Sequence, residues 1–154
     1  MTVSGRMRCG YTRRTIFIMP AAGAAPSQSV TMSDLFAPDG GWRVRILDLS
    51  GASEDNIVEE VPGFLTLMQA NAFARAYVRD SVERCRVPGM NTKDVLDAWF
   101  AFGEDAEIVD GGDGAWRSAT ELSDFVARAA SHEECNWRAL DPRQDDDDEE
   151  AGDE

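Results

Sequence analysis

The sequence offers few of the residues from which metal sites, redox sites and many catalytic sites are built. It has one histidine and three cysteines, and no two cysteines show the spacing of a C-x-x-C motif. A zinc ribbon or a thioredoxin-like redox pair requires that spacing, so the sequence argues against both. It also lacks the run of about eighteen apolar residues that a membrane-spanning helix requires. We therefore predict a protein with no cofactor and no membrane contact, and its few cysteines favour the reducing cytoplasm.

The nearest approach to a catalytic or metal-binding pair is His132 with Cys135. A zinc site needs three or four ligands, and the chain has no second Cys/His pair. A nucleophilic cysteine needs a positive environment, whereas Glu133 and Glu134 raise the pKa of a neighbouring thiol. Cys85 lies within an apolar helical stripe, where core packing is the simpler interpretation. We predict no catalytic or metal-ligating residue, and the alternative is a small hydrolase or transferase that uses carboxylates or Cys135.

A group of acidic residues surrounds a glycine-rich turn and is the second place to look for a ligand site. Its members are Glu104, Asp105, Glu107, Asp110 and Asp113. The group lacks the alternating Asp or Asn positions and the final Glu of an EF-hand calcium loop. No lysine follows the nearby glycines, so a phosphate-binding loop is not indicated either. We interpret this segment as a solvated acidic loop.

The charge is distributed unevenly along the chain, whose formal net charge is −14. Residues 1–33 contain four arginines and no acid, whereas residues 139–154 contain nine acids and one arginine. Residues 34–138 hold twenty acids and ten bases. Such a balance repels the phosphate backbone of nucleic acids. We therefore predict no direct nucleic-acid binding and expect a basic protein surface as the partner.

The composition divides the chain into an extension (residues 1–33), a single domain (residues 34–138) and a tail (residues 139–154). The stretch at 20–29 is rich in Ala, Gly, Pro and Ser, and Met32 opens the acidic part like an ordinary N-terminus. We predict that residues 1–33 are a disordered or mis-assigned extension. The alternative is an export signal of the twin-arginine type in residues 1–25, because Arg13-Arg14 precede an uncharged stretch with the A-x-A pattern at Ala22-Gly23-Ala24.

The C-terminal tail carries six consecutive acidic side chains: Asp145, Asp146, Asp147, Asp148, Glu149 and Glu150. Neighbouring carboxylates repel one another, and no apolar residue ties this run to a core. We predict a disordered tail that either keeps the protein soluble or engages a basic surface electrostatically.

Hydrophobic periodicity predicts the first elements of the domain. Alternation in residues 42–46 indicates a strand with one buried face, and either a bulge near Leu47 or burial of both faces at that end explains why Leu47 and Leu49 break the alternation. Residues 57–61 predict its hairpin partner, ended by Pro62-Gly63. Thr66 and Gln69 fit a capping box that starts a long helix to about Arg86. Its apolar face comprises Leu67, Ala70, Ala74, Tyr77, Val78, Ser81, Val82 and Cys85.

The second half of the domain predicts a shorter helix capped by Asn91 or Thr92 and ended by Gly103, a strand at 106–109, and a last helix. The shorter helix has a broad apolar face of Val95, Leu96, Trp99, Phe100 and Phe102. A second capping box at 118–121 precedes a stripe of Leu122, Phe125, Val126, Ala129 and Ala130. The order β-β-α-α-β-α predicts an α+β fold, a small, mostly antiparallel sheet with helices packed on one face. The other face is free for homo-oligomerisation.

One polar ridge stands out on the long helix, off its apolar face: Asn71, Arg75, Arg79 and Arg86. Two interpretations remain open, because the arginines can pair with neighbouring acids, such as Arg79 with Glu83, or bind an anion or a partner. We predict a non-catalytic interaction or regulatory module that binds another protein. Besides the hydrolase or transferase, the alternative is an acidic competitor of nucleic-acid binding.

Overall fold

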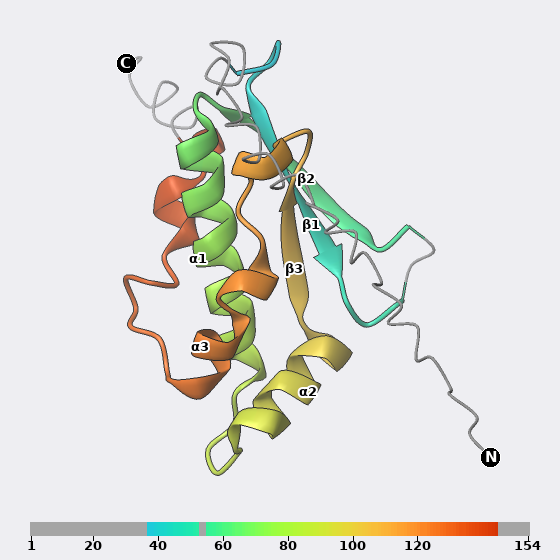
Figure 1. The fold of residues 1–154 in the computed structure, drawn as a ribbon, viewed down its shortest axis with the longest axis vertical. Helices are drawn as coiled ribbons and strands as arrows, with labels where there is room; N and C mark the ends of the chain where they lie inside the picture. The colour runs from blue at the N-terminus through green and yellow to red at the C-terminus, as the bar shows by residue number, and fades with distance from the viewer. Residues whose placement is uncertain (1–36, 53–54, 145–154) are drawn as a thin grey trace, which may run out of the picture.

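The computed structural model describes residues 37–52 and 55–144, and its centre is a three-stranded antiparallel sheet (Figure 1). β1 (Trp42–Asp48) lies between β2 (Ile57–Phe64) and β3 (Glu104–Ile108). The helices are α1 (Leu67–Cys85), α2 (Thr92–Phe102) and α3 (Leu122–Ala127). α1 packs on one face of the sheet, and α2 and α3 pack on α1, which confirms the predicted α+β fold and its element order.

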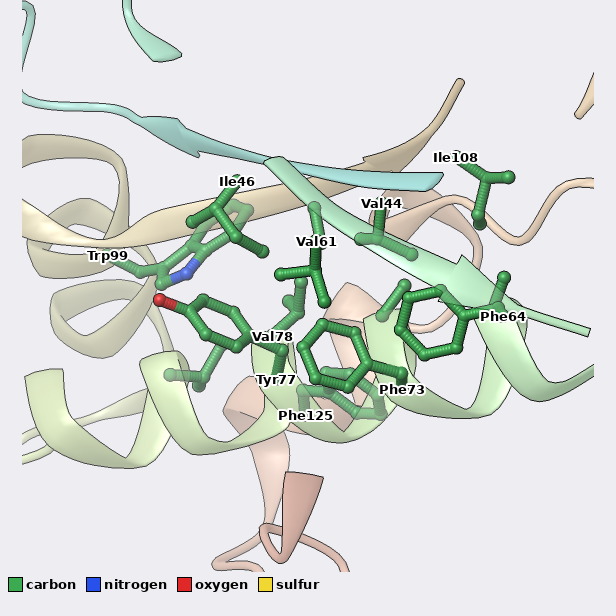
Figure 2. Close-up of a cluster of buried hydrophobic side chains, with 14 of the residues drawn as sticks. Val44, Ile46, Val61, Phe64, Phe73, Tyr77, Val78, Trp99, Ile108 and Phe125 are labelled. Atoms are coloured by element: carbon green, nitrogen blue, oxygen red, sulfur yellow. The ribbon is translucent and has the colours of Figure 1, made fainter. Parts of the chain in front are cut away.

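The core forms between the inner face of the sheet and α1 (Figure 2). In β1, Val44 and Ile46 are fully buried, whereas Arg43 and Arg45 alternate with them and face away. α1 presents its own buried stripe to this layer, which includes Phe73, a residue that the predicted stripe omitted. The apolar face predicted for the strand and the apolar face predicted for the long helix therefore pack against each other in one core.

β2 is longer than predicted. We expected it to end at Pro62-Gly63, but it continues to Phe64, whose ring is buried. The proline is tolerated because β2 is an edge strand, and Gly63 takes up the local irregularity with a φ of 95° where the register with β1 shifts. A second register shift pairs Ile46 with Glu59 and Leu47 with Ile57, so the extra residue there is Val58 of β2, whereas β1 keeps a continuous register with β3. The bulge predicted in β1 near Leu47 therefore lies in the partner strand instead.

The first two helices begin as the sequence predicts. Thr66 and Gln69 form the capping box of α1, in which each side chain binds the other's backbone N–H. Asn91 caps α2, and Asp94 completes a second box of the same kind. α2 ends at Gly103, as predicted.

α2 buries less apolar surface than predicted. Val95 and Trp99 reach the core, but Phe100 and Phe102 are 54% and 80% exposed. The prediction that both phenylalanines belong to the buried face is therefore wrong. The physical reason is the position of α2 beyond one end of the sheet (Figure 1), where it packs on α1 and α3 through the side that carries Trp99.

The second predicted capping box is also wrong. Residues 118–120 form a 3₁₀ turn, η3 (Ser118–Thr120), and no side chain caps α3. The Ser118 hydroxyl instead donates to Asp105 Oδ2 at 2.9 Å, and the Glu121 carboxylate accepts hydrogen bonds from Arg75. α3 ends at Ala127, before the end of the predicted stripe.

After α3 the chain returns along α1 and stays packed past the predicted domain boundary at Arg138. In the 3₁₀ turn η4 (Trp137–Leu140), the Trp137 ring lies 5.1 Å from that of Tyr77. Pro142 then packs on the backbone of Gly63. The predictions for the extension, the export signal and the acidic run from Asp145 concern residues outside the described part of the chain.

The outer face of the sheet carries a row of ion pairs. Arg43 and Arg45 of β1 lie 2.7 Å and 3.5 Å from carboxylate oxygens of Glu60 on β2. Arg45 also lies 2.8 Å from Glu107 on β3. The face that we predicted to be free for homo-oligomerisation thus presents charges paired across the strands. Self-association through it stays a prediction.

The outer edge of β3 has its own hydrogen-bond partners. Glu104 and Ala106 direct their backbone N–H groups away from β1. Ser81 Oγ accepts from the first at 2.8 Å, and Asp105 Oδ1 accepts from the second at 2.8 Å. These two contacts satisfy donors that an edge strand commonly leaves open.

Candidate functional site

The side chains of the predicted polar ridge on α1 form hydrogen bonds within the protein. We expected Arg79 off the apolar face, but its side chain is completely buried, and it lies 3.7 Å from Glu83. Arg79 donates to the backbone carbonyls of Phe125 and Arg128 at 2.6 and 2.9 Å, and Arg86 donates to the same two at 2.8 and 3.0 Å. Two guanidinium groups of α1 therefore cap the C-terminal end of α3, whose carbonyls lack intrahelical partners.

The other two ridge residues hold the segment that precedes α3. Arg75 forms a bidentate pair with Glu121 at 2.7 and 2.9 Å, and its hydrogen bonds lower the pKa of the Glu121 carboxyl. The Asn71 side chain donates to the carbonyl of Gly114 and accepts from the N–H of Trp116. All four ridge residues thus bind groups of their own chain. Partner binding by this ridge stays a prediction.

His132 and Cys135 lie near each other in sequence but do not form a reactive pair with a base and an electropositive pocket. His132 is exposed, and neither residue lines the two hollows described below. Burial raises the pKa of the half-buried Cys135 thiol, and the nearby Asp80 and Glu83 raise it further. Within residues 37–52 and 55–144, no His, Cys, Asp and Glu side chains are grouped as a metal site.

The clearest surface feature is a groove where the end of α1 meets α2. It encloses about 440 Å³. Its lining residues are Ser81, Arg84, Cys85, Val87, Met90, Ala98, Phe102, Gly103 and Glu104. Phe102 is 80% exposed and Val87 is 54% exposed. Apolar side chains that gather around a hollow are typical of an interaction surface, whereas isolated ones are not.

The charges at the rim of the groove are paired within the chain. Arg84 lies 2.9 Å from Glu104 and 3.4 Å from Asp80. The Tyr77 hydroxyl also donates to Glu104, at 2.8 Å. Burial, followed by the hydrogen bond to Glu104, raises the pKa of Tyr77 to about 12. The rim therefore holds fixed, mutually satisfied charges around an apolar hollow.

Hydrogen bonds and close packing hold together the residues beneath the groove. The Trp99 indole N–H donates to Ser81 Oγ at 3.2 Å, and the same oxygen accepts from the N–H of Glu104. Trp99 also lies so close to Gly103 that a Cβ atom there would come within 2.3 Å of its Cδ1. Because α1, α2 and β3 are locked together in this way, the hollow is formed before anything binds.

A second hollow of about 510 Å³ lies beside β3 and the glycine-rich turn, at the acidic segment singled out in the sequence. Burial raises the pKa of Asp105 there, although the Ser118 hydroxyl and the N–H of Ala106 both donate to its carboxylate. Glu107 is paired with Arg45. These side chains are committed to holding the loop against β3, and they do not converge on a common point in the hollow.

The sequence reasoning missed the groove, although a signal for it was present. Five large apolar residues in an eleven-residue helix exceed what one buried face of α2 can hold. Phe100 and Phe102 are the surplus, since the core takes Val95 and Trp99. Which surplus side chain faces a hollow depends on the packing of α2 against α1, and periodicity alone does not give that.

None of the helices in the described part of the chain combines the length and the apolar character of a membrane span. Comparison with family models, with curated proteins and with solved structures finds no match for this chain.

Proposed function

We propose that this protein is a non-catalytic interaction module that binds another protein through the groove between α1 and α2. The observation that carries the proposal is the exposure of Phe102 at the edge of a preformed hollow whose other apolar walls are Val87 and Met90. Aromatic side chains and the pockets that they fill recur at the centres of protein interfaces, where most of the binding energy is concentrated. Apolar surface exposed to water raises the free energy of the protein, and a partner that covers this surface lowers it.

The groove suits one apolar side chain of a partner. Its polar groups already have partners, because Ser81 Oγ accepts two hydrogen bonds and Arg84 is paired with Glu104. A polar ligand would compete with these contacts, whereas an aliphatic or aromatic side chain would leave them intact. The partner surface around that side chain should be basic, since the chain carries a net charge of −14.

The test compares two phenylalanines of the same helix. Phe102 lines the groove, whereas Phe100 is also more than half exposed but packs against Trp99 with the rings tilted and does not line the hollow. Partners captured by the wild-type chain would be identified by mass spectrometry, and their affinity would be measured for Phe102→Ser and Phe100→Ser by calorimetry. Loss of a central hot-spot side chain weakens binding by at least about thirty-fold.

We expect that loss for Phe102→Ser and little change for Phe100→Ser. Both variants should unfold at nearly the wild-type temperature, because neither side chain is part of the core. Equal affinities for the two variants, or a partner that binds both as tightly as the wild type, would rule out the groove as the binding site.

A further inference from the structure

Two polar groups of the groove have partners within the chain but keep one hydrogen-bonding position each, and the first is the Ser81 hydroxyl. Its oxygen accepts from the Trp99 indole N–H at 3.2 Å and from the N–H of Glu104 at 2.8 Å. These bonds use both lone pairs of a hydroxyl oxygen and leave its proton. Within residues 37–52 and 55–144, no group accepts that proton. Ser81 is 1% exposed and lines the groove, so a group that enters the groove can accept it.

The carboxylate of Glu104 supplies the second position. Its Oε2 accepts from the Tyr77 hydroxyl at 2.8 Å and from Arg84 at 2.9 Å. In the described part of the chain, no donor is bound to its Oε1. Glu104 also lines the groove, and its backbone N–H binds Ser81. The unused proton of Ser81 and the unused oxygen of Glu104 therefore belong to two residues in direct contact.

Apolar side chains line the same groove as these two polar positions. They include Val87, Met90 and Phe102, of which Phe102 and Val87 are more than half exposed. A polar group that entered without an apolar body would leave these side chains in water. The best occupant is therefore mostly apolar and carries one polar atom that both donates and accepts a hydrogen bond.

Among protein side chains, tyrosine combines these properties. Its ring is a large apolar surface, and its phenol oxygen is both a donor and an acceptor. Phenylalanine makes neither hydrogen bond, and the indole N–H of tryptophan donates but does not accept. Serine and threonine have a hydroxyl but no ring. Tyrosine is also enriched among the residues that contribute most of the binding energy at protein interfaces.

We infer that the groove takes a tyrosine side chain of the partner protein and binds its hydroxyl between Ser81 and Glu104. The phenol oxygen accepts from the Ser81 hydroxyl, and the phenol proton is donated to Glu104 Oε1. The inference rests on the proposed function, because it names the side chain that the partner inserts. A phosphate on this tyrosine would bring about two negative charges to the Glu104 carboxylate, so phosphorylation of the partner would prevent binding.

The experiment uses amino-acid analogues and needs no identified partner. N-acetyltyrosinamide and N-acetylphenylalaninamide differ only in the phenol hydroxyl. Each is titrated into the full chain while the methyl signals of Met90 and Met68 are followed by NMR. Met90 lines the groove, whereas Met68 lies in the first turn of α1, is 80% exposed and serves as the internal control. Met90→Leu and Met68→Leu variants assign the two signals.

We expect both analogues to shift the Met90 signal and to leave the Met68 signal unchanged. The tyrosine analogue should bind about ten-fold more tightly, because its hydroxyl gains a hydrogen bond to a charged carboxylate. The phosphorylated tyrosine analogue should leave the Met90 signal in place. Phe102→Ser should weaken the binding of both unphosphorylated analogues, and Phe100→Ser should weaken neither, since Phe100 does not line the groove.

Removal of the Ser81 hydroxyl tests the assignment of the donor. Ser81→Ala should bring the affinity of the tyrosine analogue close to that of the phenylalanine analogue. The substitution also takes an acceptor from Trp99 and from Glu104, so thermal unfolding must show that the variant is folded. The comparison of the two analogues in the wild-type chain decides the question even if this variant unfolds.

Three results would overturn the inference. One is equal affinity of the two analogues for the wild-type chain. Another is an unchanged Met90 signal up to the solubility limit of the tyrosine analogue. The last is a folded Ser81→Ala chain that keeps the full preference for the tyrosine analogue.

These outcomes are distinct from a failure of the proposed function. Equal affinities would leave the groove as a site for a purely apolar side chain of a partner protein. Conversely, if Phe102→Ser left the affinity of every captured partner unchanged, the proposed function would fail, whereas a measured preference for the tyrosine analogue would remain.

Discussion

Replacement of Arg79 by methionine tests whether the buried guanidinium holds α3 in place. The substitution keeps most of the side-chain volume but removes the charge and the two hydrogen bonds to the carbonyls of Phe125 and Arg128. It also removes the position of the guanidinium 4.8 Å above the Phe125 ring. Arg86 keeps its own bonds to both carbonyls, so they retain a donor.

The expected loss follows from these contacts. A hydrogen bond with a charged donor contributes about 1.5–3 kcal/mol. Burial lowers the pKa of Arg79, which reflects the cost of keeping its charge away from water, and the methionine recovers part of that cost. We expect Arg79→Met to lower the free energy of unfolding by about 2 kcal/mol. Arg79→Ala should lower it by about 4 kcal/mol, since it leaves a cavity as well.

Urea unfolding followed by circular dichroism measures both variants, with Arg84→Met as the matched control. Arg84 lies on the same helix but has a side chain that is 54% exposed, so its ion pairs contribute at most about 1 kcal/mol. The reasoning is refuted if Arg79→Met loses no more stability than Arg84→Met. A gain in stability would also refute it, because the cost of burying the charge would then exceed the stabilisation from its hydrogen bonds to α3.

Four further predictions concern single side chains. Phe125→Ala should lower the free energy of unfolding by about 3 kcal/mol in the same urea assay, because the ring is buried between α1 and α3. Gly103→Ala should lower it by about 2 kcal/mol, because the new methyl group collides with Trp99. The Tyr77 phenol has a pKa raised from 10.0 to about 12, so it stays protonated in the folded chain where the unfolded chain ionises. Its contribution to stability should be complete below pH 10 and disappear as the pH rises to about 12, which unfolding measured across that range against Tyr77→Phe will show. Iodoacetamide should modify Cys135 more slowly than free cysteine at the same pH, as followed by mass spectrometry, because burial raises the pKa of the thiol.

The sequence pattern correctly predicted those parts of the fold that depend on interactions between residues close together in the chain. The alternation around Val44 and the capping box of Thr66 each rest on contacts within a few residues, and the structure confirms both. The second predicted capping box failed because Ser118 and Glu121 have stronger partners far along the chain. For these two residues the hydrogen bonds to Asp105 and Arg75 replace the local cap that the same side chains could have made.

The environments of Arg79 and Phe102 could not be predicted from local patterns, because they too depend on contacts between distant elements. Arg79 has the spacing of a solvent-facing residue, yet it is buried because α3 packs over it and offers unpaired carbonyls. Phe102 has the spacing of a core residue, yet it is exposed because α2 extends beyond the end of the sheet. In both cases the decisive neighbour is another element, whose position the pattern of the residue's own helix does not contain.

The closed edge of β3 bears on how the protein behaves at high concentration. Growth of a sheet into a fibril requires each arriving strand to find free N–H donors on the last one. On β3 the donors of Glu104 and Ala106 are already bound by Ser81 and Asp105. Two short side chains thus occupy donors that an added strand would need, so strand addition on this side gains fewer hydrogen bonds than on an open edge.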